Sequence, residues 1–489
     1  MSNLQFQNVN YFTKQFVTKM QTTVNVRISV KKEISNVVSV GSESAIVSYD
    51  STNGNASFYG KTLIKFLYND GMGLVSSNYN ADFTADVQNE LLTTDTKLLF
   101  DIVTIDTKVD TNANTAMLTI VLEIAVFGYF PQSVNCLVGG ENIYACKDNI
   151  SLSKGVDVAQ IPFVVDEELT ATHPIEGVLL AESCVCLSDH YFGDGALHLK
   201  GIATVRLTYT SDGNIYTDSL PFDFEREVDT ANINCKNLQL RVDVRTTKVR
   251  LDITQEGNKV FLADITCNLG LENTLIDGVE IVTDCYSADC DYNLQKQQIT
   301  TTLPLPTVCA ERTFSVSLSK DTDKKLQTVV NVSAIVTKSS VGSDSFTVDG
   351  IVYATAIYHG EQMESELLEI PFSQKIDAKG VGANSAICAN VVVTNFTLAD
   401  DGALQANITL CVRANLFSDA TYWVITDAES IPFDRRKLPA LQIYFAHKGE
   451  NLWTLGKNLH MSTDEILVLN PELTNPLTAD ARIVVFNKI

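Results

Sequence analysis

Apolar and polar residues alternate along most of residues 20–433, in runs that are rich in Val, Thr and Ile. The alternation is clearest in Val242-Asp243-Val244-Arg245 and in Ala406-Asn407-Ile408-Thr409-Leu410. Short polar stretches of Asn, Asp and Gly interrupt these runs. A period of two, broken by turn-forming residues, predicts antiparallel β-strands joined by tight turns. We therefore expect a mostly β body with little helix.

One apolar run occurs three times. Each copy begins with Gly and reaches Tyr eight residues later, at Gly60–Tyr68, Gly201–Tyr209 and Gly350–Tyr358. The copies are separated by roughly one domain length. Such a repeat predicts three similar domains, each with an equivalent strand at this position.

Each copy is followed by a predicted hairpin. The paired segments are Leu98–Val109 with Ala116–Val126, Leu240–Ile253 with Val260–Leu269, and Asn390–Leu398 with Leu404–Ala414. Pro-Phe steps recur at Pro162, Pro221, Pro371 and Pro432. Because proline has no amide hydrogen for a ladder, we expect these positions to begin strands or to lie on sheet edges.

The repeats and one polar segment divide the chain. We predict an N-terminal arm at 1–19, three antiparallel β repeats at 20–150, 151–300 and 301–433, a linker at 434–440, and a small domain at 441–489. The linker is assigned to the polar run that begins at Asp434 and ends at Pro439, because proline stops a helix.

The last fifty residues follow another pattern. Tyr444–Leu455, Ser462–Pro471 and Arg482–Phe486 predict strand, turn, helix, loop, helix and strand in that order. This βααβ order resembles the LysM domain, which usually recognises N-acetylglucosamine polymers such as peptidoglycan and in some members binds protein partners.

The LysM resemblance implies a groove and a small core. The groove residues would be Gly449, Glu450, Asn451, Leu467, Leu469, Asn470 and Pro471. The core residues would be Leu452, Trp453, Leu455, Ile466 and Ile483. At the turn into the first helix, a side-chain oxygen can cap the helix, and exposed backbone amides can meet a sugar acetamide.

Three β repeats followed by LysM resemble the SPOCS-domain (DUF3794) proteins of endospore-forming bacteria. The resemblance covers nearly the whole chain. It implies a non-enzymatic scaffold of spore-coat assembly, located in the mother-cell cytoplasm at the forespore surface. There the LysM domain would dock to a coat morphogenetic protein.

Charge and length limit the other functions. The formal net charge of −23 argues against nucleic-acid binding, because phosphate contacts need clustered Lys and Arg. We expect no membrane span, because no apolar run reaches roughly 18 residues. Residues Met1–Phe16 show no secretion-signal pattern, so we expect a cytoplasmic protein or one exported by an unrecognised route.

The eleven cysteines have no regular spacing, so we expect reduced and mostly buried thiols. Alternation predicts that Cys184 and Cys186 share one strand face, as core thiols and not as a metal site with His190. A local bridge between Cys285 and Cys290 is a minor alternative.

The sequence contains no catalytic motif, so we expect neither an enzyme nor a cofactor. Three alternatives stay open: a wall protein that binds peptidoglycan or chitin-type glycan, a wall hydrolase that LysM targets, and a self-assembling filament subunit or other homo-oligomer.

Overall fold

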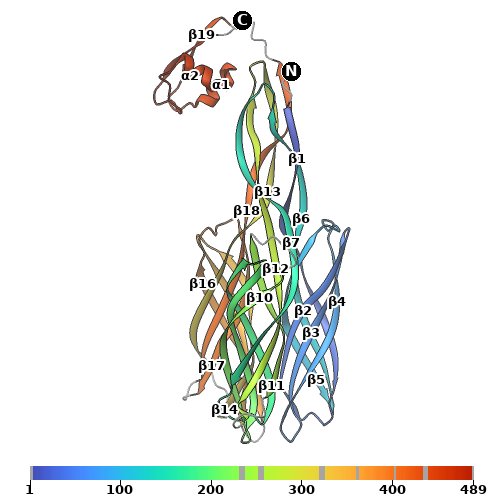
Figure 1. Cartoon of the computed structure of the whole chain (residues 1–489). Coiled ribbons are helices and arrows are strands. Elements are labelled where there is room, and N and C mark those ends of the chain that lie inside the picture. The colour runs from blue at the N-terminus through green and yellow to red at the C-terminus, as the bar shows by residue number, and fades with distance from the viewer. Residues whose placement is uncertain are drawn as a thin grey trace.

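A computed structural model describes residues 4–230, 237–251, 258–318, 325–359, 363–400, 404–432 and 439–486. Within these ranges the chain forms twenty strands and two short helices. Figure 1 shows a broad body of strands, a narrow stalk that rises from it, and a small helical module at the tip of the stalk. The prediction of a mostly β chain is confirmed.

The body consists of three modules with the same topology. Module 1 contains β1 (Leu4–Ser29), β2 (Asn36–Thr52), β3 (Asn55–Asn69), β4 (Leu74–Gln88), β5 (Lys97–Asn112) and β6 (Thr115–Gly140). Module 2 contains β7 (Tyr144–Thr170), β8 (Gly177–Gly193), β9 (Ala196–Ser211), β10 (Asn214–Val228), β11 (Leu238–Leu251) and β12 (Val260–Tyr286). Module 3 contains β13 (Cys290–Leu318), β14 (Lys325–Val341), β15 (Ser345–His359), β16 (Glu364–Asp377), β17 (Ser385–Asp400) and β18 (Leu404–Pro432).

Each module packs two three-stranded antiparallel sheets around its own core. In module 1 the strand orders are β1-β6-β5 and β2-β3-β4, and modules 2 and 3 repeat both orders. Buried apolar residues of both sheets form one cluster in each module. The hairpins β5–β6, β11–β12 and β17–β18 confirm the three predicted pairs. The turn residues 252–257 and 401–403 lie outside the described residues.

The repeated Gly-to-Tyr run is the middle strand of the second sheet, in β3, β9 and β15. Its glycine lies opposite a phenylalanine of the next strand: Gly60 faces Phe83, Gly201 faces Phe224 and Gly350 faces Phe372. A Cβ on any of these glycines would collide with that ring. The glycine is therefore required because the aromatic ring covers its backbone.

Three of the four prolines occupy edge strands, as predicted, whereas Pro432 ends β18, the middle strand of its sheet. Pro221 lies in β10, Pro371 in β16 and Pro162 in β7, and each of these strands has a neighbour on one side only. A missing amide hydrogen therefore leaves no gap inside a sheet.

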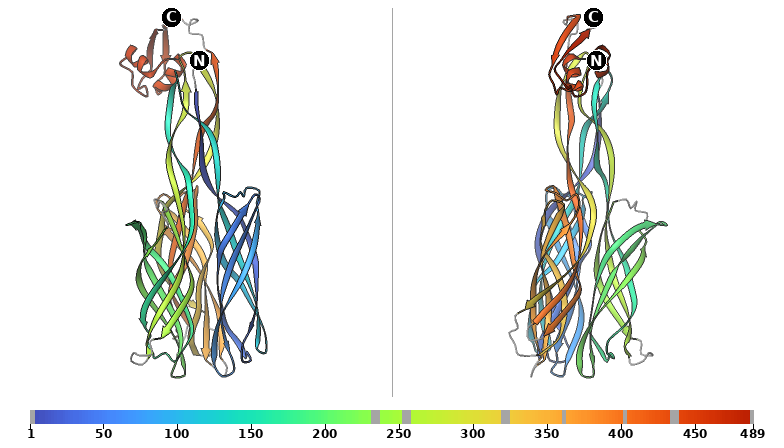
Figure 2. Two further views of the ribbon diagram at one scale, coloured as in Figure 1. Left: turned by 45° about the vertical axis from the view of Figure 1, so that its right-hand side comes forward. Right: turned by 90° about the vertical axis from the view of Figure 1, so that its left-hand side faces the viewer.

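The stalk is built by the outer halves of the six longest strands, β1, β6, β7, β12, β13 and β18 (Figure 2). In module 1, for example, Leu4 pairs with Gly140 at the tip and Ser29 pairs with Thr115 at the base of the body. The stalk core draws on all three modules: it contains Val9, Tyr11, Val134, Cys136, Ile150, Leu152, Ile281, Ile299 and Val424. The stalk is thus one shared structure.

The module boundaries differ from the predicted ones. The segment predicted as an arm, 1–19, is from Leu4 onward the first part of strand β1. The predicted boundaries after 150 and 300 fall inside β7 and β13, and the breaks lie at 141–143 and 287–289. Both errors have one cause, because the stalk halves of the strands continue the alternation of the body. Of the predicted linker, 434–438 lies outside the described residues.

The terminal module has the predicted βααβ order. It contains β19 (Leu441–Ala446), α1 (Leu452–Leu459), α2 (Thr463–Leu469) and β20 (Ala481–Phe486), and β19 pairs antiparallel with β20. Ser462 and Glu465 form a capping box at the start of α2. Neither described helix has the length and apolar character that crossing a membrane requires.

Candidate functional site

The turn into α1, where the groove was predicted, is closed by its own hydrogen bonds. Gly449 has φ of 91°, which favours glycine, and its amide donates to the Leu477 carbonyl at 2.9 Å. The Glu450 amide donates to the His447 carbonyl at 3.1 Å, and its carbonyl accepts from the Leu477 amide at 2.9 Å. The amides of Gly449 and Glu450 therefore already have acceptors inside the module.

The side chain of Asn451 caps α1, as expected for this position. Its Oδ1 accepts a hydrogen bond from the Thr454 amide at 2.7 Å. The Leu452 amide donates to Asn475 Oδ1 at 3.1 Å. The cap prediction is confirmed, and the amides of Leu452 and Thr454 have partners within the module.

Asn470 has a structural role that the groove prediction does not describe. It is 2 % exposed, and its Nδ2 donates to the carbonyls of Ile466 at 2.9 Å and Val484 at 3.0 Å. Its Oδ1 accepts from the Val484 amide at 2.8 Å. The side chain thus ties the end of α2 to β20, and it is not open to a ligand.

The remaining groove residues divide by exposure. Leu467 and Leu469 are half-buried and pack against the core of the terminal module. Pro471, like Gly449 and Asn451, is exposed. Only these three of the seven predicted groove residues are exposed.

The core of the terminal module contains Leu452, Leu455, Ile466 and Ile483, as predicted. Trp453 does not belong to it, and this part of the prediction is wrong. Its ring packs edge-on against Tyr286 of β12 at a centroid distance of 5.0 Å, and its Nε1 donates to Asp284 at 2.9 Å. The sequence of the terminal module alone cannot show that the stalk covers one side of α1.

One face of α1 docks on the stalk tip. Lys457 Nζ donates to Asp284 Oδ1 at 2.7 Å, and the Tyr286 hydroxyl donates to the Met461 carbonyl at 2.8 Å. His460 is 6 % exposed, with Nδ1 at 3.2 Å from the Ser287 carbonyl. Trp453 and Lys457 are four residues apart in α1 and therefore lie on one helix face, and His460 and Met461 extend the contact just beyond the end of the helix.

Gly456 is required for this docking. A Cβ at Gly456 would collide with the Tyr286 hydroxyl and would lie 2.8 Å from the Met461 carbonyl oxygen. Glycine inside a helix is unfavourable by about 1 kcal/mol relative to alanine. Here the close approach of Tyr286 explains its presence.

The docking contact shifts the pKa of Asp284. Burial disfavours the charged carboxylate, but hydrogen bonds from Lys457 and Trp453 outweigh that effect and hold the pKa of Asp284 below its ordinary value. The contact thus favours the ionised carboxylate.

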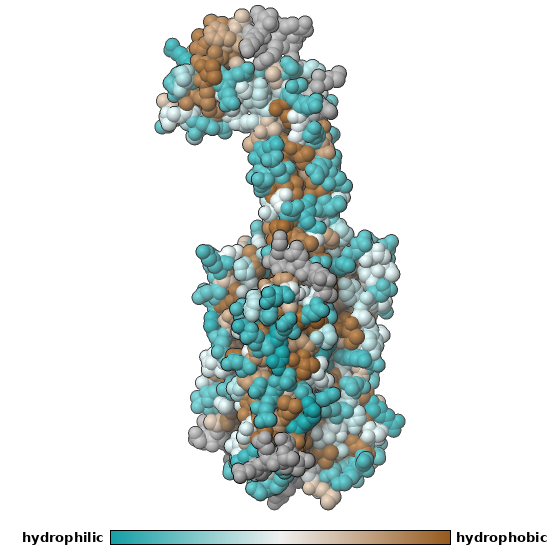
Figure 3. Space-filling model, in the orientation of Figure 1, coloured by the Kyte–Doolittle hydropathy of each residue, from teal (hydrophilic) through white to brown (hydrophobic). Residues whose placement is uncertain are grey.

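The two-stranded sheet of the terminal module exposes an apolar face, which we call the tip face. It consists of Leu441, Ile443, Phe445 and Phe486, which are 53 %, 53 %, 64 % and 54 % exposed. The Arg482 guanidinium lies 5.7 Å from the centroid of the Phe445 ring. Figure 3 shows apolar surface on the terminal module at the free end of the molecule. The sequence contained a sign of this exposed face. In Leu441-Gln442-Ile443-Tyr444-Phe445, apolar side chains lie on both faces of the strand, although only one face can cover the small core.

A cavity of about 500 Å³ lies where the three modules meet. Its charged residues pair across modules: Lys14 Nζ is 2.9 Å from Glu272, and Arg241 Nη1 is 2.7 Å from Asp101. Lys14 also lies 3.4 Å from the centroid of the Phe417 ring, so one side chain contacts all three modules. These pairs join the modules at the base of the stalk.

One thiol, that of Cys388, lines this cavity. Burial raises the pKa of Cys388, which disfavours the thiolate, the reactive form of cysteine.

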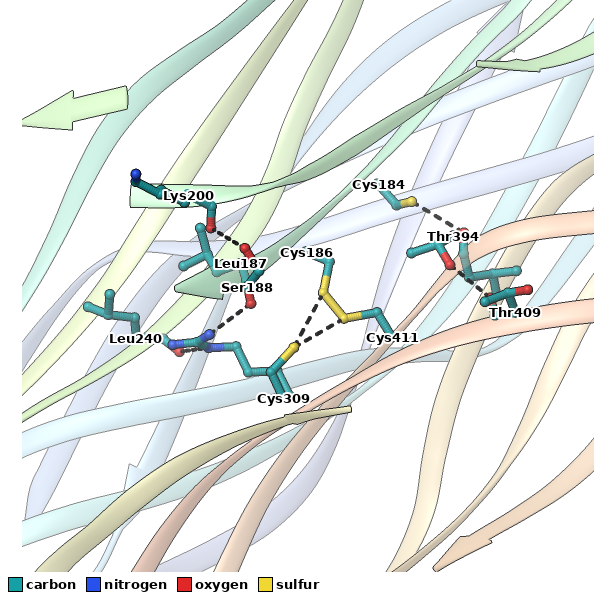
Figure 4. Close-up of a disulfide and its surroundings, with 12 residues drawn as sticks. Cys184, Cys186, Leu187, Ser188, Lys200, Leu240, Cys309, Thr394, Thr409 and Cys411 are labelled. Atoms are coloured by element: carbon teal, nitrogen blue, oxygen red, sulfur yellow. Dashed lines mark hydrogen bonds between the residues drawn. A yellow bond between two sulfur atoms is a disulfide. The ribbon is translucent and has the colours of Figure 1, made fainter. Parts of the chain in front are cut away.

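The cysteines depart from the prediction in one place. Cys186 of β8 and Cys411 of β18 form a disulfide that joins modules 2 and 3 (Figure 4). The bond escapes sequence reasoning because the two residues are 225 positions apart. The Cys184 thiol donates to the Val393 carbonyl of module 3 at 3.2 Å. Cys184 and Cys186 thus both contact module 3, in agreement with the prediction that they share one strand face. Cys285 is buried and not disulfide-bonded, so the alternative bridge to Cys290 is absent.

Comparison of the chain with models of protein families and with curated proteins finds no match.

Proposed function

We propose that this protein is a non-enzymatic scaffold of endospore coat assembly, which docks to a coat morphogenetic protein through its LysM-like terminal module. The proposal places it in the mother-cell cytoplasm at the forespore surface. It draws on the resemblance to SPOCS-domain proteins and on the position of the terminal module at the end of the stalk. The observation that carries it is the tip face, an exposed apolar sheet surface at the far end of the molecule.

A protein partner fits this module better than a glycan. The amides of Gly449, Glu450 and Leu452 are bonded within the module, and Asn470 is fully engaged by backbone groups. Few groups are thus left to recognise a sugar acetamide. The tip face instead offers large apolar side chains beside one arginine, a composition typical of protein interfaces.

The body would act as a spacer and an assembly platform. Three modules fused around one stalk keep the terminal module away from the acidic body. Several modest contacts within one chain raise apparent affinity by effective concentration, which suits an organiser of a protein coat.

The test uses the full-length chain, labelled in a sporulating host. We expect the double variant Ile443→Ser, Phe445→Ser to lose its accumulation at the forespore surface by about tenfold or more, because hot-spot side chains contribute ~2 kcal/mol or more each. The matched control is Val468→Ser, since Val468 is 80 % exposed on α2, outside the tip face. Normal localisation of the double variant, or of a chain lacking 440–489, would contradict the proposal.

A second arm separates protein docking from glycan binding. The full-length protein is sedimented with purified sacculi in the presence and absence of chitin oligomers. Strong binding that chitin oligomers inhibit would replace our proposal with a glycan-binding one. A clearing band on a peptidoglycan zymogram would show a hydrolase and would contradict the absence of catalysis.

A further inference from the structure

Three cysteine sulfurs from three strands meet where module 2 packs on module 3. Cys186 lies on β8, Cys309 on β13 and Cys411 on β18, and their sulfurs are all within 4.8 Å of one another. The Cys309 sulfur is 3.9 Å from that of Cys186 and 3.7 Å from that of Cys411 (Figure 4). Among the described residues, this is the one group of three or more His, Cys, Asp or Glu side chains whose ligand atoms lie close enough together to bind one metal ion.

A buried cation stands beside this group. Arg413 of β18 pairs in register with Cys309 and is 9 % exposed. Its Nε donates to the Leu240 carbonyl at 3.2 Å and its Nη1 donates to the Leu187 carbonyl at 2.9 Å. Its Nη2 is buried and has no recorded hydrogen-bond partner within the described part of the chain.

Arg413 lies beside the cysteines, since it pairs in register with Cys309 and follows Cys411 by two residues on the same strand. Arg413 also lines a small cavity of about 10 Å³ together with Cys186 and Cys411. An incompletely bonded guanidinium in this position favours negative charge on the neighbouring sulfurs.

We propose that, in the reduced protein, Cys186, Cys309 and Cys411 bind one thiophilic d¹⁰ metal ion, of the zinc or copper(I) class. Three thiolates without an oxygen ligand select such ions over magnesium or calcium. Three thiolates around a divalent ion carry one net negative charge, which the Arg413 guanidinium offsets. Cys309 is exposed, so an ion can enter from solvent.

The disulfide and the metal exclude each other. Opening the Cys186–Cys411 bond needs a dithiol reductant, which supplies two electrons and two protons and leaves as a disulfide. The metal then displaces the protons of the three thiols and forms three metal–sulfur bonds. In either state modules 2 and 3 are joined at this point.

The position of the Cys309 sulfur agrees with binding of one metal ion by all three cysteines. Its sulfur is almost equally far from the other two, so it lies beside their bond and not on the extension of it. Thiol–disulfide exchange proceeds by attack on one sulfur, whereas ligation of one ion needs three sulfurs around a common point.

The test measures metal binding by the full-length protein, reduced with a dithiol that is then removed without oxygen. Cadmium(II) is the probe, since cadmium thiolates absorb in the ultraviolet, and zinc(II) is tested by competition with a coloured chelator. We expect one tightly bound ion per chain and a loss of affinity of at least about tenfold in Cys309→Ser. The matched control, Cys184→Ser, removes a thiol of the same strand that lies outside the group and should bind normally.

Cys309 is exposed, so its replacement by serine should leave the fold intact, and circular dichroism checks this. Absence of stoichiometric binding by the reduced chain would overturn the proposal. So would equal affinity of Cys309→Ser and the unaltered protein, or equal binding before and after reduction.

Discussion

The body and the stalk are built from the same six long strands, yet their cores are organised differently. In the body each module buries apolar residues of its own two sheets, as Leu207 and Phe261 do in module 2. In the stalk, residues from all three modules share one core, where Leu152 of β7 meets Val9 of β1 and Val424 of β18. The body thus has one large core in each module. A smaller cluster, shared by all three modules, lies between them and contains Val38, Leu67, Leu179, Leu180, Ile215, Val330 and Ile357. The stalk has no core that belongs to one module alone among the described residues.

This difference has a functional consequence. A deletion in the core of one module should act first on that module, because each large body core draws on one module only. Damage to the stalk affects all three modules and also the platform on which the terminal module sits. The stalk therefore couples the integrity of the whole body to the position of the docking module.

The strongest test of the comparison deletes one buried side chain in each region. Leu207→Ala in the module 2 core and Leu152→Ala in the stalk should each lower the free energy of unfolding by about 2–5 kcal/mol. Both leucines are 0 % exposed, so each serves as the control of the other.

Amide hydrogen exchange then separates the two variants. Leu207→Ala should raise exchange mainly in the body strands of module 2, whereas Leu152→Ala should raise it in the stalk halves of all six long strands. If both variants opened the same segments, the division into local and shared cores would be wrong.

Glycine replacements should have a smaller effect that also differs between the regions. A Cβ at Gly201 would collide with the Cys186 carbonyl and the Phe224 ring, so Gly201→Ala should cost about 1–3 kcal/mol or more. Gly278 lies on the stalk part of β12 with no atom within 4 Å of an added Cβ. Gly278→Ala should therefore change the urea midpoint very little, and an equal loss in both variants would contradict the packing argument.

The smallest predicted effect concerns the contact between stalk and terminal module. Asp284→Asn should weaken docking by about 1 kcal/mol, an amount reduced by partial solvent exposure of the ion pair. The pKa of Asp284 is lowered in the folded protein, so docking is fully stabilised above the ordinary carboxyl pKa and weakens as the pH falls through the lowered value.

Trp453 lies in the docking contact, so its fluorescence reports docking. The other tryptophan, Trp423 of β18, is replaced by phenylalanine to remove its signal. We expect the acid transition to disappear in Asp284→Asn and to persist in the control Asp277→Asn, an exposed residue of the same strand. Persistence in Asp284→Asn would assign the transition to another group.

Local patterns in the sequence predicted much of this fold. Alternation and turn residues predicted the hairpins, and the Gly-to-Tyr run identified the equivalent middle strands of three modules, because both follow from pairing between neighbouring strands. The βααβ order and the Asn451 cap were also readable, since a helix start is set by a few adjacent residues. The groove assignment was less accurate, because the engagement of Asn470 depends on β20.

The sequence by itself determined the strand content, the three repeats and the small terminal module, since each depends on residues close together in the chain. Only the tertiary structure decided that the repeats share a stalk, that Trp453 faces Tyr286, and that Cys186, Cys309 and Cys411 meet. These contacts join residues more than a hundred positions apart, and alternation repeats identically along the strands of body and stalk. The chain pattern tells which side of a strand is apolar, but the packing of the modules selects what that side touches.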